Sequence, residues 1–316
     1  MTVGRHPSNS AVADVPVIDY EGSHYKSDFW LGQGRDYEDA AERLALIELL
    51  PTTGGRIAEI GAGFGRLADL YLGYEQIVLF DYSRTLLADA VVRWGNDPRF
   101  IFVAGNIYQL PFATGILDSL VMVRVMHHLA NVPAALQQLT RVLHSQSVAV
   151  LEYANKRNIK AIVRWLFGKQ PWSPFEPLPV EFVELNFDFH PAWMRTQVNQ
   201  AALDIQNQWA VSHFRLPLLK DRIPAQRLAQ WDRRIFSLGG QFPLAPSVFL
   251  KGQISQQRER AVIDTSAHAV ASLFRCPHCA AEMFTLQTPS LLVCGNCQAA
   301  FAQKGKIWDF KELASV

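Results

Sequence analysis

Residues 56–72 contain a glycine-rich turn between an expected strand and an expected helix, and this turn constrains the fold more than any other feature of the chain. The apolar stretch 56–60 runs into three glycines, Gly61, Gly63 and Gly65. Residues 66–72 then carry apolar side chains at helical spacing. Glycine tolerates a positive φ, and its missing Cβ lets a ligand approach the backbone closely. The pattern predicts a strand–turn–helix unit that holds a nucleotide-like ligand.

Two carboxylates beside the glycine turn indicate the charge of that ligand. Glu59 lies two residues before Gly61, and Asp81 ends the apolar run 77–80, which we interpret as a second strand. The dinucleotide fingerprint G-x-G-x-x-G is not met, because Arg66 occupies the position of its last glycine. A carboxylate at Glu59 would repel a pyrophosphate but suits a cation, and Asp81 can accept ribose hydroxyls. We therefore expect S-adenosylmethionine, with a purely structural turn as the alternative.

Four segments occur in the order found in one enzyme family. They are residues 59–65, Asp81-Tyr82-Ser83, Gly105-Asn106-Ile107 with Leu110-Pro111-Phe112, and Asp118 through His127-His128-Leu129. Through these motifs, over residues 25–255, the chain resembles class I S-adenosylmethionine-dependent methyltransferases of the small type 11 group. The resemblance implies an α/β, Rossmann-like methyltransferase fold with a doubly wound, seven-stranded, mostly parallel sheet. It implies an enzyme that transfers methyl groups and says little about the acceptor.

The expected elements agree with such a sheet, because strands alternate with helices. The expected strands are 56–60, 76–80, 100–103, 119–123, 147–152, 205–214 and 247–250. The expected helices are 37–50, 83–94, 132–143, 192–203 and 224–238, with Ser83 and Asn131 as N-caps of the second and third.

The cofactor in such folds lies over the carboxyl ends of the parallel strands, which selects the candidate binding residues. Arg35 is expected to grip the methionine carboxylate, with helix-start packing as the alternative. Asn106 is expected at the adenine edge together with the backbone of Ile107, with a turn-forming role as the alternative. The candidate set is Glu59, Gly61, Gly63, Gly65, Asp81, Tyr82, Asn106, Ile107, Arg124 and Arg35.

Arg124 and His127 follow the fourth expected strand and are the candidate catalytic residues. Arg124 interrupts an apolar run, and a buried arginine needs a partner. We expect it to face the pocket and bind a substrate carboxylate or phosphate, with an ion pair to Glu152 as the alternative. Of His127 and His128, one is expected to pack on the helix and one to face the site, and His127 is the candidate proton acceptor, with packing as the alternative.

Residues after the fifth expected strand are candidate substrate ligands. Asn155, Lys156 and Arg157 are expected to bind an anionic substrate, with a solvated loop as the alternative. His190 belongs to an aromatic flap, where it can form a pair with Asp188 over the substrate, and an aromatic cap with surface charges is the alternative.

All four cysteines lie near the C-terminal end of the chain, in two C-x-x-C pairs. Cys276 and Cys279 are separated from Cys294 and Cys297 by 14 residues. Two such turns complete a tetrahedral site for structural zinc, with no position left open for catalysis. Disulfides and a redox pair are the rival interpretations. The segment resembles the zinc ribbons that accompany some RNA and protein methyltransferases, either attached or as separate activator subunits.

We expect a flexible tail at 1–22, a methyltransferase domain at 23–254 with a flap at 155–190, a linker at 255–272 and the zinc ribbon at 273–316. The chain has 30 basic and 29 acidic residues, so its charge does not favour nucleic acid. Without a long apolar run or a signal peptide, we expect a cytoplasmic protein and no membrane partner.

The expected reaction is methyl transfer to an oxygen or nitrogen of a small metabolite. The cysteines are assigned to zinc, which argues against a covalent thiol adduct with a pyrimidine. Two alternatives remain open. One is an RNA or protein methyltransferase that docks through the ribbon, and the other is a non-catalytic cofactor-binding scaffold.

Overall fold

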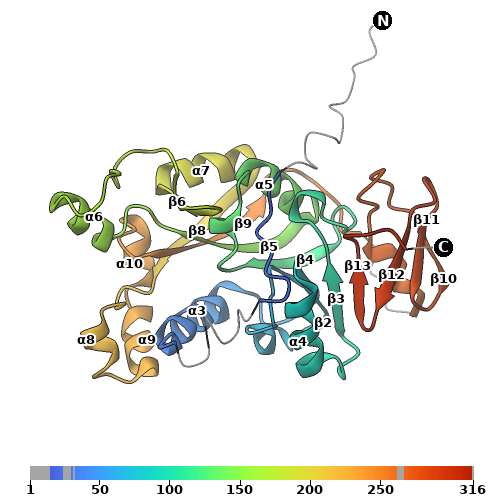
Figure 1. The fold of residues 1–316 in the computed structure, drawn as a ribbon, viewed down its shortest axis with the longest axis horizontal. Coiled ribbons are helices and arrows are strands. Elements are labelled where there is room, and N and C mark those ends of the chain that lie inside the picture. The colour runs from blue at the N-terminus through green and yellow to red at the C-terminus, as the bar shows by residue number, and fades with distance from the viewer. Residues whose placement is uncertain (1–14, 24–29, 31–32, 262–266, 315–316) are drawn as a thin grey trace, which may run out of the picture.

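A central sheet with helices on both faces forms the body of the molecule (Figure 1). The computed structural model describes residues 15–23, 30, 33–261 and 267–314. Seven strands follow the order β3-β2-β1-β4-β5-β9-β8, in which β3 through β5 are parallel and β9 and β8 antiparallel. This confirms the predicted doubly wound, mostly parallel sheet. The strands are β1 (Gly54–Ile60), β2 (Tyr74–Asp81), β3 (Phe100–Ala104), β4 (Leu117–Met122), β5 (Leu143–Ala154), β8 (Leu203–Val211) and β9 (Ser247–Ile254).

The helices begin largely where the sequence predicts. The Leu86 N–H donates to the Ser83 Oγ at 3.3 Å, and the Ala134 N–H donates to the Asn131 Oδ1 at 3.1 Å, so both predicted N-caps are confirmed. The helices are α3 (Asp36–Leu49), α4 (Arg84–Trp94), α5 (Val132–Arg141), α6 (Ile159–Leu166), α7 (Pro191–Gln200), α8 (Pro217–Lys220), α9 (Ala225–Arg233) and α10 (Phe236–Gln241). A small hairpin, β6 (Val180–Val183) with β7 (Asn186–Asp188), lies in the flap.

Three expected elements differ from the prediction. The single helix expected over 224–238 is divided into α9 and α10 by a turn at residues 234–235. The helix expected over 66–72 is only a 3-10 turn, η1 (Ala68–Tyr71), and it ends before Gly73, where a Cβ would lie 2.0 Å from the Thr52 carbonyl oxygen. The strand expected to reach residue 214 ends at 211. There the Ser212 N–H donates to the buried Asp232 carboxylate at 2.7 Å instead of to a neighbouring strand.

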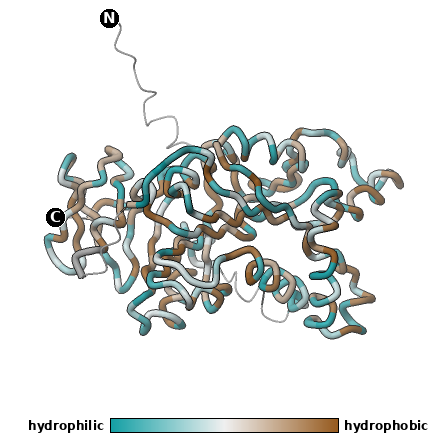
Figure 2. The backbone as a smooth tube through the Cα atoms, turned by 180° about the vertical axis from the view of Figure 1, so that it is seen from behind, coloured by the Kyte–Doolittle hydropathy of each residue, from teal (hydrophilic) through white to brown (hydrophobic). Residues whose placement is uncertain are grey.

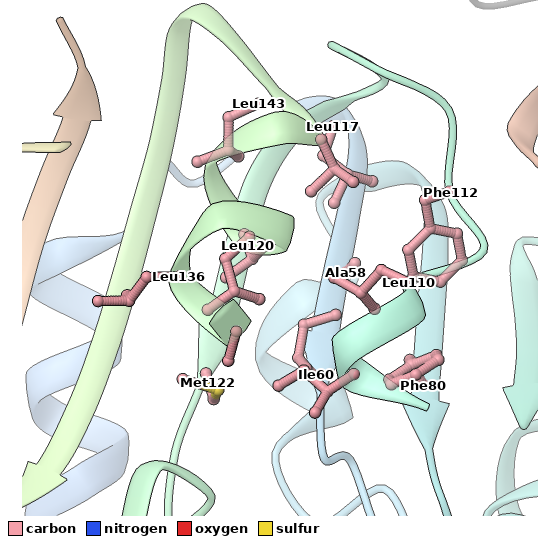
Figure 3. Close-up of a cluster of buried hydrophobic side chains, with 14 of the residues drawn as sticks. Ala58, Ile60, Phe80, Leu110, Phe112, Leu117, Leu120, Met122, Leu136 and Leu143 are labelled. Carbon is pink, nitrogen blue, oxygen red and sulfur yellow. The ribbon is translucent and has the colours of Figure 1, made fainter. Parts of the chain in front are cut away.

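The two faces of the sheet bury separate apolar clusters. Ala58 and Ile60 point to one face with Phe80 and Leu120, and Figure 3 shows these side chains together. Ile57 belongs to the cluster on the other face, which α3 and α9 cover. Successive residues of a strand point to opposite faces, so Glu59 lies on the Ile57 side.

The ribbon continues the sheet. Its strands are β10 (Phe284–Thr288), β11 (Leu291–Cys294), β12 (Ala300–Lys304) and β13 (Ile307–Asp309). Strand β13 pairs in parallel with β3 and makes the sheet eleven-stranded. The rings of Phe274 and Phe112 stack at 6.3 Å, so the ribbon shares the core of the main domain. A second contact comes from the expected linker, where the Arg258 guanidinium donates to the carbonyl oxygens of residues 140, 141 and 143.

The N-terminal segment was expected to be flexible, but its described part lies against the main domain. The Glu21 carboxylate accepts hydrogen bonds from the backbone N–H groups of Arg84 and Thr85 at 2.9 and 3.1 Å, at the start of α4. A carboxylate is favourable there, because the first N–H groups of a helix lack partners within it. Residues 1–14 lie outside the described part of the chain.

Candidate functional site

The glycine turn after β1 is left-handed at each of its three glycines, with φ of +77° at Gly61, +53° at Gly63 and +69° at Gly65. A Cβ on Gly61 would lie 2.1 Å from Val125, and one on Gly65 would lie 3.1 Å from Trp94, so these two positions are required by packing. A Cβ on Gly63 would meet nothing closer than 3.9 Å. Gly63 is therefore the glycine whose bare face is available to a ligand.

Asp81, at the end of β2, fixes the conformation of this turn. One carboxylate oxygen accepts the Gly63 N–H at 2.7 Å, and the other accepts the Ser83 N–H at 2.9 Å. Burial raises the pKa of Asp81, although these two N–H groups, the Tyr82 N–H and the Lys311 ammonium oppose that rise. Each oxygen retains a second lone pair, which can accept a ligand hydroxyl.

A first cavity opens at the carboxyl ends of the parallel strands. Of the predicted cofactor residues, those in its wall are Gly61, Gly63, Asp81, Tyr82, Ile107 and Arg124. Its volume is about 100 Å³, which is below the 300–1,000 Å³ usual for small-molecule sites. The cavity is narrow because Val17, Ile18 and Tyr20 of the N-terminal segment also line it.

The other four predicted cofactor residues do not line this cavity. Glu59 is 3% exposed on the opposite face of β1, where burial raises its pKa to about 8. On that face Glu59 does not line the first cavity, so the expectation that its carboxylate supplies a negative charge to a ligand there is not met. Gly65 packs against Trp94, and the Asn106 Oδ1 accepts the Tyr108 N–H at 2.9 Å as a helix cap. The fourth residue, Arg35, lines a neighbouring cavity.

Arg124 lies between the two cavities and lines both. Its φ is +60°, which is rare for a residue with a side chain. The predicted partner, Glu152, accepts the Arg124 backbone N–H at 2.8 Å, whereas the guanidinium pairs with Glu42 at 2.5 Å. Burial would raise the pKa of Glu42, but Arg124 and Arg66 outweigh it and hold that pKa below its usual value. Glu42, a carboxylate on the inward face of the amphipathic helix α3, was not predicted from the sequence.

The second cavity has a volume of about 520 Å³, within the range of small-molecule sites. Tyr20, Arg124 and His128 line it together with the first cavity, so the two are neighbours. The remaining wall is formed by Arg35, His127, Glu152, Ala154, Phe182, Val183, Asn186, Asp188, Arg215 and Pro246.

Titratable groups in the second cavity are shifted by burial. Burial, with the charge of Glu152, raises the pKa of Asp188 to about 6. Burial, with His128 and Arg124, lowers the pKa of His127 well below its usual value, so its imidazole is neutral at pH 7. The Nε of Arg215 is buried and has no hydrogen-bond partner among the described residues. Arg215 was not predicted, because a single arginine after a strand carries no sequence pattern.

Most of the predicted substrate ligands have structural roles instead. Asn155 is fully buried, and its amide donates to the carbonyl oxygens of Pro243 and Ala245 at 2.9 and 2.8 Å. The Lys156 ammonium donates to two flap carbonyl oxygens, those of residues 176 and 178. His190 accepts the Ala192 N–H as the N-cap of α7. Arg157 lies in the wall of neither cavity. The expectation that this set binds the substrate is therefore corrected.

The four cysteines meet as the spacing predicts. Their sulfur atoms all lie within 4.8 Å of one another, and none of the four forms a disulfide. The Sγ atoms of Cys276 and Cys297 are 3.6 Å apart, and those of Cys279 and Cys294 are 3.5 Å apart. Tetrahedral zinc with bonds of about 2.3 Å would place sulfurs roughly 3.8 Å apart, so this donor set fits the metal.

The segment that leaves the ribbon also touches the first cavity. Asp309 of β13 is 1% exposed and accepts from the Arg84 guanidinium at 2.9 Å. The Lys311 ammonium donates to the Tyr82 carbonyl oxygen at 3.0 Å and lies 3.8 Å from the centre of the Tyr82 ring. The ribbon thus supports the wall of the cavity that follows Asp81.

Among the described residues, none of the helices has both the length and the apolar character needed to cross a membrane. Residues 58–151 match the family described as Methyltransferase domain. A demethylmenaquinone methyltransferase from Beutenbergia cavernae is 28% identical over 137 residues, which cover 43% of this chain and 50% of that protein. The chain therefore spans about half the length of this curated relative.

Two solved structures share the fold. A chain of the complex between the Haloferax volcanii Trm112 methyltransferase activator and a methyltransferase has a TM-score of 0.51 at 14% identity, with 74% of this chain and 98% of that chain covered. A protein from Listeria monocytogenes designated an S-adenosylmethionine-dependent methyltransferase has a TM-score of 0.50 at 14% identity, with 70% and 99% covered. Residues 58–151 of this chain thus match a methyltransferase domain family, and the chain has a Rossmann-like α/β fold that a four-cysteine ribbon extends.

Proposed function

We propose that this protein transfers a methyl group from S-adenosylmethionine to an oxygen or nitrogen of a small metabolite that carries an anionic group. The observation that carries the proposal is the pairing of Gly63 with Asp81. Gly63 offers bare backbone in a left-handed turn, and Asp81 holds that turn while keeping free lone pairs. This combination suits a nucleoside, with the ribose hydroxyls donating to Asp81.

The first cavity holds the cofactor in this proposal, and the N-terminal segment moves outward to admit it. Val17, Ile18 and Tyr20 lie across the site, and their withdrawal would enlarge a cavity that is now about 100 Å³. Their return over the bound cofactor would exclude water from the reacting groups. Ile107 and Tyr82 also line this cavity and supply an apolar wall.

The second cavity holds the acceptor. The sulfonium of the cofactor already activates the methyl group, so the protein has to align the acceptor and exclude water. Arg215, whose Nε has no hydrogen-bond partner among the described residues, would bind the acceptor's anionic group, with Arg35 beside it. Asp188, with a pKa of about 6, is ionised at neutral pH and can take the proton that an O–H or N–H acceptor releases. Neutral His127 can take the same role.

We also propose that Cys276, Cys279, Cys294 and Cys297 bind one structural zinc ion. The support is their mutual distance of at most 4.8 Å. With four thiolates the site would be closed, so its part in the reaction would be indirect, through the fold of the ribbon.

The test is a methyl-transfer assay with tritiated S-adenosylmethionine against a cell extract divided into metabolite, RNA and protein fractions. We expect label in the metabolite fraction with the wild type and loss of that label with Asp81→Asn. Label confined to RNA or protein would replace the acceptor class with a macromolecule. No label in any fraction, although the protein binds the cofactor in calorimetry, would favour a non-catalytic scaffold.

A further inference from the structure

Helix α6 presents an apolar face to solvent. Ile159, Val163, Leu166 and Phe167 follow one another at helical spacing, so they share one face of the helix and its last turn. They are 58%, 46%, 66% and 73% exposed, whereas Ala161 on the opposite face is buried. A surface helix of a globular protein normally turns its apolar face to the core, so α6 is inverted.

The turn after α10 extends this face. The Ile159 N–H donates to the Leu244 carbonyl oxygen at 2.9 Å, which places the two segments side by side. Phe242 in the same turn is 71% exposed. Because one phenylalanine covers about 150–250 Å², the exposed parts of Phe167 and Phe242 alone amount to roughly 200–350 Å². That is comparable with the largest apolar patch of a typical monomer, which is often functional.

This surface lies at the end of the molecule opposite the ribbon. Figure 1 shows α6 and α10 together at that end, and Figure 2 shows hydrophobic residues along the same part of the chain from behind. Nothing in the described part of the protein lies beyond α6, so a flat partner can approach this end without meeting the main domain.

Positive charges accompany the apolar face. Residues 157–169 contain Arg157, Lys160, Arg164 and Lys169 and no carboxylate. In the described part of the chain, none of these four side chains takes part in an ion pair. Lys160 and Arg164 are four residues apart and therefore lie together along one flank of the apolar face. Long basic side chains can rest their stems on apolar surface while their charges reach outward.

We propose that α6 and the 242–244 turn bind the surface of an anionic lipid bilayer. The apolar face would enter the interface and the four cations would reach the phosphate headgroups, as in interfacial amphipathic helices. The helix has 8 residues, which is too few to span a bilayer. The proposal therefore replaces the expectation of no membrane partner with binding at the membrane surface only. The charges argue against a second copy of the chain as the occupant. In a two-fold interface the same patch meets itself, so the cations of one copy would oppose those of the other.

One end of this face is near the second cavity, because Pro246, two residues after Leu244, lines that cavity. Phe182 and Val183 of the β6–β7 hairpin are 51% and 59% exposed and also line that cavity. The flap between α6 and the hairpin is fixed by the Lys156 ammonium and by the contact of the Trp165 and Phe175 rings at 5.7 Å. If the acceptor of the proposed reaction has an apolar part besides its anionic group, it can enter the cavity from the bilayer. This last step rests on the proposed function, whereas vesicle binding does not.

Vesicle flotation with the full-length, zinc-loaded protein tests the proposal. The vesicles are phosphatidylcholine with and without phosphatidylglycerol. Leu166→Ser combined with Phe167→Ser removes apolar contact, Lys160→Glu combined with Arg164→Glu reverses charge, and Val92→Ser is the matched control. Val92 is 85% exposed but lies on α4, away from this face.

We expect binding to the anionic vesicles that weakens with salt and on removal of phosphatidylglycerol. Each double variant should bind at least about tenfold more weakly, because burial of one apolar side chain contributes a factor of about ten and each basic residue at an anionic surface contributes a factor of about five. Val92→Ser should bind like the wild type. Equal binding by all variants, or no vesicle binding, would overturn the proposal. Analytical sedimentation would also overturn the proposal if the wild type formed a dimer that the apolar double variant did not form, and if the wild type did not bind vesicles. Cofactor calorimetry on the same samples reports separately on the methyltransferase site.

Discussion

Asp81→Asn tests the reasoning about the cofactor site most directly. The substitution keeps the shape of the side chain but replaces one acceptor oxygen by an NH2 donor and removes the charge. In the wild type the two oxygens accept the Gly63 and Ser83 N–H groups at 2.7 and 2.9 Å. In the variant one of these N–H groups faces another donor, so the glycine turn loses one of the two bonds that hold it.

The size of the effect on binding follows from these bonds. A hydrogen bond to a charged group contributes about 1.5–3 kcal/mol. The asparagine oxygen can still accept one ribose hydroxyl, so the variant loses one hydrogen bond between residue 81 and the cofactor. Each 1.4 kcal/mol is a factor of ten, so the dissociation constant for S-adenosylmethionine should rise roughly 10- to 100-fold.

Isothermal titration calorimetry with S-adenosylmethionine measures this change, and circular dichroism checks that the variant is folded. Asp97→Asn is the matched control, because Asp97 is a carboxylate on the surface that pairs only locally with Arg99. Its affinity should equal that of the wild type. If Asp81→Asn is folded and binds within threefold of the wild type, the assignment of Asp81 to the ribose is refuted.

Three further predictions concern the turn, the ribbon and a buried carboxyl group. Gly63→Val should abolish cofactor binding in calorimetry, because a β-branched side chain disfavours φ of +53° and would occupy the open space beside Gly63, where no protein atom lies closer than 3.9 Å. Unchanged affinity would contradict the role of Gly63 in binding the cofactor. Elemental analysis should find one zinc per chain, and Cys294→Ser should lose zinc and melt at a lower temperature; a metal-free protein with four reactive thiols would refute the site. Burial raises the pKa of Glu59 to about 8 in the folded state from 4.5. The stability from its protonated form is therefore present below pH 4.5 and lost as pH rises through 8. This group should lower the free energy of unfolding of the wild type, measured with urea, by on the order of 3 to 5 kcal/mol at pH 9 relative to pH 4, and Glu59→Gln should abolish that difference. If the free energies of unfolding of the two proteins change with pH in parallel, the prediction is refuted.

The sequence predicted the sheet because its signals are local. The runs that became β1 and β2, the Ser83 cap and the left-handed glycines are set by neighbouring residues. The cysteine site was predictable for the same reason, since the spacing of two C-x-x-C turns almost fixes how sulfur atoms can meet.

The candidate site was only half predictable. Asp81 and Gly63 lie where the pattern indicated, but Glu59 points to the other face of its strand. Asn155 and Lys156 have the residue types expected of a substrate site, yet their polar groups hold the flap and the turn beside it. Arg215 comes from beyond β8, so its place in the acceptor cavity depends on how strands far apart in sequence pair.

The sequence by itself determined the order of elements, the glycine turn and the clustering of the four cysteines, because each depends on backbone preferences over a few residues. Tertiary structure decided which face each charged side chain meets, that β13 would pair with β3, and that α6 would keep its apolar face outside. The physical reason is that burial and strand pairing are free energies of contacts between distant segments, which local spacing does not specify.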